Sequence, residues 1–476
     1  MSFSAFHFPV YLGLLLTVLG GMQAVGKRWK IVPRLQLVLL LAASYGFVAV
    51  ADWRFCGCLI IVSAFVYFIA ILIDRCVFRR TCLVGGIICL VVVLGYFKYC
   101  NFFLESFTQL FHRPCITQEI ILPLGISFYV FSALSYLIDV YRRDYPAERN
   151  ALTLGLYIAF FPKLLAGPIV RGKDFFPQVQ HYRGLDCNAF LTGLQIFVFG
   201  LFKKIVLADH LGVFVDDVFY APRAYSGGTM LLAVVSYSLQ IYFDFSGYSD
   251  MAIGTARLLG FDFRPNFNLP YLSQNVSEFW SRWHISLSTW FRDYLYIPLG
   301  GSRKGEIRTC FNLLVVMLVS GLWHGAGYTF LLWGALHGVL CCFHKCLGKQ
   351  LARLGRLANG ALTFVAVSLL WVVFRADGIA TAGQVYRGLF TFQDGICQPY
   401  TWSFFAIAVV LGASVVAIQR SRRLGISERH GNPTVAGFYP ILDLSRFWSK
   451  IAFFTFVGLT ILLGYYGDTA FIYGAF

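Results

Sequence analysis

Long uncharged runs recur along the chain, separated by short polar stretches. The first, residues 8–26, has no charged residue and is long enough to cross a bilayer as a helix. It is followed by the basic residues Lys27, Arg28, Lys30 and Arg34. Similar apolar runs, with Asp139 as their one charged residue, cover 35–51, 57–73, 82–97, 120–140, 309–323, 326–343, 360–374, 402–418 and 451–467. The pattern predicts an all-α polytopic membrane protein.

The middle of the chain is less regular. Apolar runs at 152–166, 188–207 and 228–245 are interrupted by charged residues, namely Lys163, Lys203, Lys204 and Asp244. A charge at the centre of an isolated membrane helix costs about 2.5–3.5 kcal/mol on insertion scales. We therefore expect these residues at helix ends, in re-entrant segments or facing a polar cavity. In total the sequence predicts about 11–13 hydrophobic segments.

Basic residues fall on alternate loops, which predicts one orientation in the membrane. We expect Arg80 and Arg422 on the cytoplasmic side, with the N-terminus, Phe107 and Ile472 outside. Lys and Arg number 39 against 23 Asp and Glu, a net charge of +16. Cytoplasmic loops explain this excess, so a nucleic-acid partner is not expected.

Composition supports a membrane protein. Hydrophobic residues make up 58% of the chain and charged residues 13%, too few to cover the surface of a soluble protein. The 13 cysteines lie mostly in apolar runs, which is typical of small buried side chains. No cysteine spacing fits a zinc site, and we expect no metal. Cys100 and Cys115 are weak candidates for a disulfide.

Residues 277–296 mix aromatic and charged side chains. Trp280, Trp283 and Trp290 lie among Glu278 and Arg282, a pair at the i,i+4 spacing of an ion pair on a helix. Charges oppose a lipid-exposed span, whereas aromatic rings favour the headgroup level. We expect this segment to lie along the membrane or re-enter it from the cytoplasmic side, either as an anchor helix or as part of a site.

Three histidines lie in or beside apolar segments. His284 is in the aromatic segment, and His324 follows an uncharged run within Gly-Leu-Trp-His-Gly. An ionisable residue at membrane depth suggests function, and a neutral imidazole suits a general base that takes a proton from an attacking hydroxyl. His337 fits a structural role between packed helices better.

Several motifs in order resemble one known family. They are Leu122-Pro-Leu-Gly-Ile-Ser-Phe-Tyr129, Ser135-Tyr-Leu-Ile-Asp-Val-Tyr-Arg142, Phe160-Phe-Pro-Lys-Leu-Leu-Ala-Gly-Pro-Ile-Val-Arg171, Tyr242-Phe-Asp-Phe-Ser-Gly-Tyr-Ser-Asp-Met-Ala-Ile-Gly254, the run from Asn266 to Gly301, and Gly321-Leu-Trp-His-Gly325. Together they resemble the membrane-bound O-acyltransferase (MBOAT) family, in its bacterial alginate O-acetyltransferase branch. The resemblance covers about 120–340 within a single domain expected over 1–476.

The resemblance implies a ring of tilted and re-entrant helices around a central tunnel. It implies that His324 is the catalytic base and His284 the second polar group, orienting or stabilising. It also implies acetyl-CoA as a cytoplasmic acyl donor, with no permanently bound cofactor, and O-acetylation of an extracytoplasmic polysaccharide. A separate periplasmic SGNH-type acetyltransferase would be the partner, and the bacterial inner membrane the location.

Two other functions remain open from the sequence. A D-alanyl transfer protein for teichoic acid shares the Trp-His segment, although Val170 and the Tyr296–Arg303 run favour the acetylating branch. A non-enzymatic acyl or glycan transporter could use four charged residues along its path, Lys203, Lys204, Asp244 and Asp250, but we find no inverted repeat or paired broken helices typical of transporters.

Overall fold

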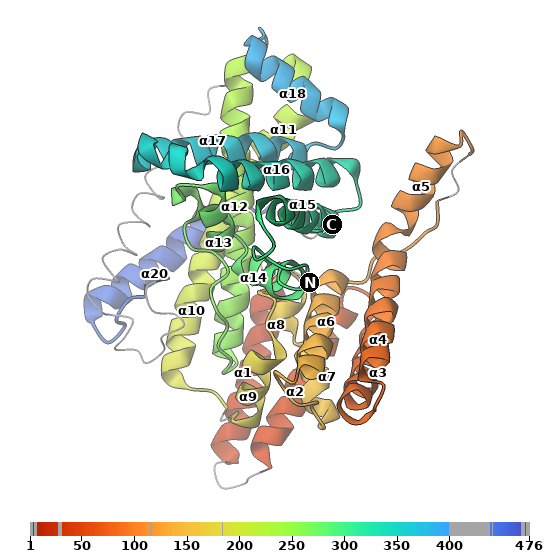
Figure 1. The fold of residues 1–476 in the computed structure, drawn as a ribbon. Helices are drawn as coiled ribbons and strands as arrows, with labels where there is room; N and C mark the ends of the chain where they lie inside the picture. Colours follow the sequence, from red (N-terminus) through yellow and green to blue (C-terminus); the bar gives the residue numbers. More distant parts are fainter. Residues whose placement is uncertain are drawn as a thin grey trace. The chain divides into compact units, whose positions relative to one another are not determined.

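A computed structural model describes residues 3, 7–26, 31–114, 117–182, 184–398, 438–439, 441–467 and 472, and almost all of the regular structure is helical (Figure 1). Outside the helices, the described residues form one isolated β-bridge, between Tyr225 and Ile396. The chain divides into two compact units, Met1–Leu194 with Ala252–Phe263 and Gln195–Met251 with Arg264–Phe476. The all-α fold expected from the sequence is confirmed.

The first unit is built from the N-terminal helices and the beginning of α10. Its elements are α1 (His7–Val25), α2 (Val32–Ala49), α3 (Arg54–Arg75), α4 (Arg79–Leu94), the π-helix η1 (Gly95–Tyr99), α5 (Cys100–Leu110), α6 (Ile126–Arg142), α7 (Ala151–Ala159), α8 (Phe161–Leu164), α9 (Gly172–Gln180) and the first half of α10 (Cys187–Leu201). The last turns of α12 also belong to it.

The second unit holds the remaining elements. They are the end of α10, the π-helix η2 (Phe202–Ala208), α11 (Asp209–Tyr220), η3 (Pro222–Ala224), most of α12 (Gly227–Leu258), η4 (Pro270–Leu272), α13 (Val276–Arg282), α14 (Ile285–Phe291), the π-helix η5 (Arg292–Tyr296), α15 (Glu306–His324), α16 (Tyr328–Leu351), η6 (Ala352–Leu354), α17 (Arg356–Arg375), α18 (Ile379–Thr391) and α20 (Phe447–Leu462).

Eight helical stretches among the described residues are long and apolar enough to cross a membrane. They are His7–Val25, Val32–Ala49, Arg54–Arg75, Arg79–Leu110, Cys187–Tyr220, Glu306–His324, Tyr328–Leu351 and Arg356–Arg375. On α3, Ile61 and Phe68 are more than 60% exposed, which water disfavours and lipid tails accommodate. In contrast, α6 is buried along almost its whole length and forms the core of the first unit. The chain is a multi-pass membrane protein.

Two predicted spans differ from the helices observed. The run at 152–166 is broken at Phe160, where α7 ends, because Pro162 lacks the amide proton that would continue the helix. The run at 228–245 is the first half of a longer helix, since α12 continues to Leu258. Asp244 does not end it because its carboxylate pairs with Lys204, 2.7 Å away.

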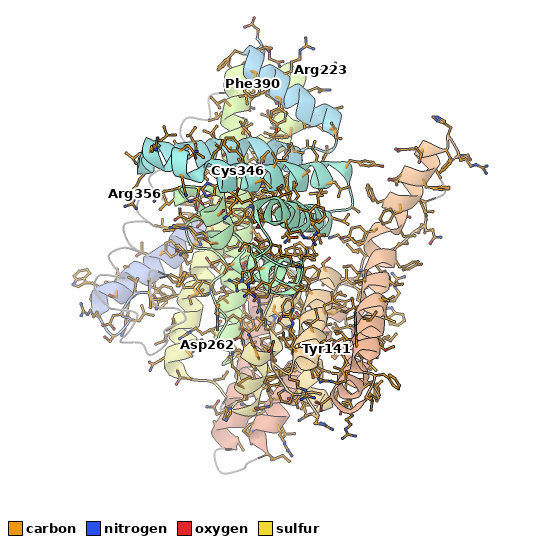
Figure 2. All side chains as sticks on the ribbon, viewed as in Figure 1. Tyr141, Arg223, Asp262, Cys346, Arg356 and Phe390 are labelled. Carbon is orange, nitrogen blue, oxygen red and sulfur yellow. The ribbon has the colours of Figure 1, made fainter. Side chains whose placement is uncertain are left out.

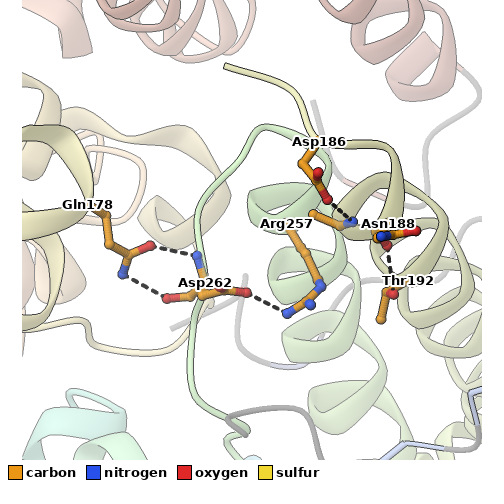
Figure 3. A network of polar contacts seen from close by, with 7 residues as sticks. Gln178, Asp186, Asn188, Thr192, Arg257 and Asp262 are labelled. Carbon is orange, nitrogen blue, oxygen red and sulfur yellow. Dashed lines mark hydrogen bonds and ion pairs between the residues drawn. The ribbon is translucent and has the colours of Figure 1, made fainter. Parts of the chain in front are cut away.

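A polar network ties the end of α12 to α9 in the first unit (Figure 3). The Gln178 amide forms two hydrogen bonds with the Asp262 backbone, of 2.7 and 3.0 Å. The Asp262 carboxylate pairs with the Arg257 guanidinium, which is 95% buried. These contacts fix the loop after α12 against α9.

Some sequence predictions concern residues outside the described part. The run at 402–418, Arg422, Cys115 and the basic residues 27, 28 and 30 all lie there. The single-domain prediction and the membrane sides of Arg80, Phe107 and Ile472 stay predictions.

Candidate active site

Glycines let α15 and α16 pack with their backbones in contact. A Cβ on Gly321 would lie 2.2 Å from the carbonyl oxygen of Phe330, and a Cβ on Gly334 would lie 2.4 Å from that of Met317. No side chain fits at these distances, so only glycine permits this approach. The contact brings His324, at the end of α15, against Trp333 on α16.

His324 is 2% exposed and surrounded by aromatic rings. Its ring centroid lies 5.0 Å from that of Trp323, 5.1 Å from that of Trp333 and 5.5 Å from that of Phe374. α15 ends at this residue, since Gly325 has extended backbone angles. The imidazole therefore lies at the C-terminal end of a membrane helix, where the backbone changes from helical to extended.

His284 joins two short helices, α13 and α14, and is fully buried. Its φ of +40° lies in the left-handed region, which costs energy for a residue with a Cβ and recurs at functional sites. The Phe245 ring contacts the His284 imidazole edge-on, with 4.6 Å between the two ring centroids. Residues 277–296 therefore form a broken helical segment and no full span, as expected; the side from which it approaches the membrane stays a prediction.

Asn266 holds the His284 side chain. The Oδ1 atom of Asn266 lies 3.2 Å from His284 Nδ1 and also accepts hydrogen bonds from the Ser286 backbone N–H at 3.1 Å and hydroxyl at 2.9 Å. Its Nδ2 donates to the Ser249 hydroxyl at 3.1 Å. The His284 Nε2 atom is buried without a hydrogen-bond partner among the described residues.

Burial lowers the pKa of the His284 imidazole to about 3, from an ordinary value of 6.5. The physical cause is the loss of water around the charged form. The ring is therefore neutral near pH 7 and keeps a nitrogen lone pair that can accept a proton or a hydrogen bond.

The fold brings His284 and His324 to one place. The Trp323 ring contacts both, at centroid distances of 6.0 and 5.0 Å. The two residues come from separate elements, the α13–α14 junction and the end of α15.

His337 lies in the same aromatic cluster. Its ring is 4.8 Å from that of Trp333 and 5.1 Å from that of Trp280, and it is fully buried. Neither of its ring nitrogens has a hydrogen-bond partner among the described residues, and the same holds for the indole nitrogens of Trp280 and Trp333. The structural role predicted for His337 is not tested by these contacts.

A cavity of about 440 Å³ opens between the start of α13 and the facing parts of α16 and α17. Val276 and Leu340 line it, and Trp280 and His337 lie one turn further along the same two helices. Arg356, His344, three amides and the Thr363 hydroxyl supply its polar side chains. Figure 2 labels Arg356, at the start of α17, and Cys346 on α16.

Three of the four charged residues that interrupt the predicted spans, Lys203, Lys204 and Asp244, form ion pairs. Lys203 Nζ lies 2.6 Å from the Asp250 carboxylate, which also accepts from the Tyr439 hydroxyl. Lys204 Nζ contacts both Asp209 and Asp244, at 2.6 and 2.7 Å. In the first unit, Lys163 is 96% buried over the Tyr157 ring, 4.1 Å from its centroid. None of the three lysines occupies a free polar path.

Sequence reasoning did not single out Asn266, Trp333 or Phe374 for the site. Asn266 lies within a motif quoted above, but its contact with His284 spans 18 residues and follows from tertiary structure. The Trp-x-x-x-His spacing of Trp333 and His337 places both rings on one helix face, which was the available signal.

Comparison with known proteins supports these observations. Residues 148–374 match the model of MBOAT, the membrane-bound O-acyltransferase family. The chain is 42% identical to the "Probable alginate O-acetylase AlgI" of Pseudomonas aeruginosa over 81% of its own length and 75% of the relative's. It is 36% identical to the peptidoglycan O-acetyltransferase of Helicobacter pylori, over 77% of its own length and 75% of the relative's.

A more distant similarity extends to a third activity. The chain is 27% identical to the teichoic acid D-alanyltransferase of Bacillus subtilis, over 71% of its length and 86% of the relative's. The acetylating relatives are more similar over comparable lengths. The chain therefore belongs to the membrane-bound O-acyltransferase family and is a membrane O-acyltransferase.

Proposed function

We propose that the protein moves an acetyl group from a cytoplasmic thioester, acetyl-CoA, to an acceptor hydroxyl used for O-acetylation of an extracytoplasmic polysaccharide. Membrane O-acetyltransferase activity is supported by the alginate and peptidoglycan O-acetylating relatives. The observation that carries the proposal for this chain is the convergence of His284 and His324 on the Trp323 ring.

The reaction needs one proton to move. The acceptor hydroxyl oxygen forms a bond to the acetyl carbonyl carbon, and the carbon–sulfur bond of the thioester breaks. His324 takes the hydroxyl proton as general base and returns it to the leaving thiolate, so that charge and atoms balance. His284 acts beside it as the second polar group.

The aromatic surroundings support this chemistry. Trp323, Trp333 and Phe374 exclude water around the His324 imidazole, which protects a thioester from hydrolysis and strengthens each hydrogen bond that the substrate makes. The unpartnered indole N–H groups of Trp283 and Trp333 are fully buried donors within the same cluster. Such donors can stabilise the oxyanion that forms at the carbonyl.

The cavity beside α13 and α16 suits the donor. Its walls are mostly apolar, while Arg356 offers a positive charge to a phosphate group. Its inner lining, Val276 and Leu340, lies one helical turn from Trp280 and His337, and Trp333 lies another turn beyond. We propose that acetyl-CoA enters by this route, from the cytoplasmic side of a bacterial inner membrane.

A separate partner would complete the pathway. We propose that an SGNH-type periplasmic acetyltransferase receives the acetyl group, as the resemblance to the alginate O-acetyltransferase branch implies. The N-terminus outside and Arg80 inside are part of the same proposed orientation.

Reconstitution into proteoliposomes tests the function. We expect acetyl-CoA supplied on the side of Arg356 to be consumed, with release of CoA and of an acetyl ester on an added hydroxyl acceptor or partner. Consumption of a D-alanyl carrier thioester in place of acetyl-CoA would replace the proposal by D-alanyl transfer. Passage of an intact substrate without thioester cleavage would favour a transporter.

A further inference from the structure

The direction of the Asn266 amide can be deduced from its neighbours. Its side-chain oxygen faces the backbone N–H of Ser286, which can only donate. If the amide were flipped, the Asn266 NH2 group would face the Ser286 N–H at 3.1 Å. Two donors would then oppose each other, and this hydrogen bond would be lost. The opposite end, Nδ2, meets the Ser249 hydroxyl, which can accept. Oδ1 is therefore the atom that faces His284.

The amide direction in turn determines the histidine tautomer. Asn266 Oδ1 is an acceptor 3.2 Å from His284 Nδ1, so Nδ1 must carry the hydrogen. The Ser286 hydroxyl also lies near Nδ1, at 3.4 Å, but it is closer to Asn266 Oδ1 at 2.9 Å and donates there. A neutral imidazole protonated on Nδ1 has its lone pair on Nε2.

The backbone keeps the two residues together. The carbonyl oxygen of Asn266 accepts a 2.8 Å hydrogen bond from the N–H of Ile285, and the N–H of Asn268 donates to the carbonyl oxygen of Arg282 at 2.9 Å. These bonds pair the segment before α13 with the α13–α14 junction. The left-handed backbone of His284 is held by this pairing, and its ring is aimed with Nε2 away from Asn266.

We infer that Asn266 is a positioning residue that fixes His284 in the Nδ1–H tautomer, so that Nε2 faces the substrate as a hydrogen-bond acceptor. The inference rests on the proposed function for the identity of the substrate. It separates the two roles left open for His284: Nε2 orients the substrate by accepting a hydrogen bond from a donor other than the hydroxyl proton that His324 takes, and it does not donate to the oxyanion. The donor to the oxyanion must come from another group, such as a buried indole N–H.

The experiment measures the tautomer directly. Full-length protein labelled with ¹⁵N-histidine is reconstituted in lipid, and the His284 nitrogen signals are identified by their loss in His284→Gln. We expect a protonated Nδ1 and an unprotonated Nε2 in the wild type; folded His284→Gln is used only to assign the signals. A His284 protonated on Nε2 in the wild type would overturn the inference.

Variants then test the positioning. Asn266→Leu keeps the volume and removes the acceptor; we expect the Nε2–H form to appear and kcat to fall about 10–100-fold at similar KM. Asn266→Asp keeps an acceptor and should retain the Nδ1–H form and most of kcat. Asn312→Leu is the matched control, because Asn312 is equally buried but bonds to the Gly301 carbonyl oxygen at 2.9 Å, and it should leave the His284 signals unchanged.

The outcomes distinguish a failure of the inference about Asn266 from a failure of the proposed function. An unchanged tautomer in Asn266→Leu would overturn positioning by Asn266, whatever the activity. Full activity of His284→Ala would instead refute the proposed use of His284, while the tautomer result stood. Equal loss of kcat in Asn266→Leu and Asn266→Asp, with the tautomer retained in Asp, would contradict a positioning role and leave only a structural one.

Discussion

Two groups of buried polar residues in the second unit differ in how they are satisfied. Around η2 and α12, each Lys meets a carboxylate: Lys203 meets Asp250, and Lys204 meets Asp209 and Asp244. In the histidine–tryptophan cluster, His284 Nε2 and both nitrogens of His337 have no hydrogen-bond partner among the described residues. Burying such groups costs about 1–3 kcal/mol each.

The difference indicates different roles. Charges paired with each other within the fold have no capacity left for a substrate, which is typical of a structural network. Polar atoms that the fold buries without a partner are available to a ligand, and they tend to lie at functional sites. We therefore propose that acyl transfer takes place in the histidine–tryptophan cluster, at His284 and His324, and that the charged network serves helix packing.

The largest expected effect is on His324. His324→Ala should lower kcat by about 10²–10⁴-fold, because a general base acts in the transition state. Membrane abundance should stay normal. Acetylation per molecule of protein, measured with CoA release, checks this. Normal turnover by a well-expressed variant would remove His324 from the mechanism.

Breaking the charged network should affect folding instead. Lys204→Met leaves Asp209 and Asp244 buried without their cation, and we expect a loss of about 3–5 kcal/mol of stability. Thermal unfolding in detergent and membrane abundance measure it. Arg54→Met removes an exposed pair with Asp52 and serves as the control, with little change expected. Equal stability of the two variants would contradict a structural role for Lys204.

His284→Ala should impair turnover less than His324→Ala, by about 10–100-fold, because water can partly replace an orienting group. The measurement is kcat at saturating donor, with His337→Ala in parallel.

We expect His337→Ala to act mainly on stability, through the cavity left between Trp280 and Trp333. If His337→Ala lost turnover at normal abundance while His324→Ala did not, His337 would be the general base and His324 the structural residue.

Filling the cavity should weaken donor binding. Leu340→Trp places a larger ring in the lining between α13 and α16, and we expect KM for acetyl-CoA to rise several-fold with a smaller change in kcat. Leu318→Trp, at an exposed position on α15 outside the cavity, is the control. An unchanged KM in Leu340→Trp would place the donor elsewhere.

The last expected effect concerns the pH dependence of stability. The pKa of His284 is about 3 in the folded protein and 6.5 ordinarily, so the unfolded chain binds a proton that the folded chain does not as pH falls below 6.5. This contribution to stability is complete above pH 6.5 and is lost at about 1.4 kcal/mol per pH unit between pH 6.5 and 3. The melting temperature of the wild type should fall as the pH is lowered through that window, and His284→Gln should make this fall less steep. The same fall in both proteins would show that His284 does not cause it.

The sequence was sufficient for the fold class because hydropathy alone identifies apolar spans such as 8–26 and 57–73, seen as α1 and α3. It was misleading at Asp244, where a charge suggested the end of a span. The helix continues because Lys204 comes from another element to pair with it. Periodicity within one segment cannot reveal such a partner.

The site was predictable only in part. His284 and His324 stood out as ionisable residues in apolar surroundings, but their shared contact with Trp323 depends on the packing of α15 against the α13–α14 junction. Asn266 carries no charge and forms its key bond across 18 residues. Its importance follows from hydrogen-bond geometry that no local sequence pattern specifies.

The most direct test is a comparison of turnover per folded molecule in His324→Ala and Lys204→Met, each purified in lipid and corrected for the folded fraction. We expect His324→Ala to be fully folded and nearly inactive, and the folded fraction of Lys204→Met to turn over acetyl-CoA at close to the wild-type rate. Loss of turnover in folded Lys204→Met together with near-normal turnover in His324→Ala would contradict the assignment of catalysis to the histidine–tryptophan cluster.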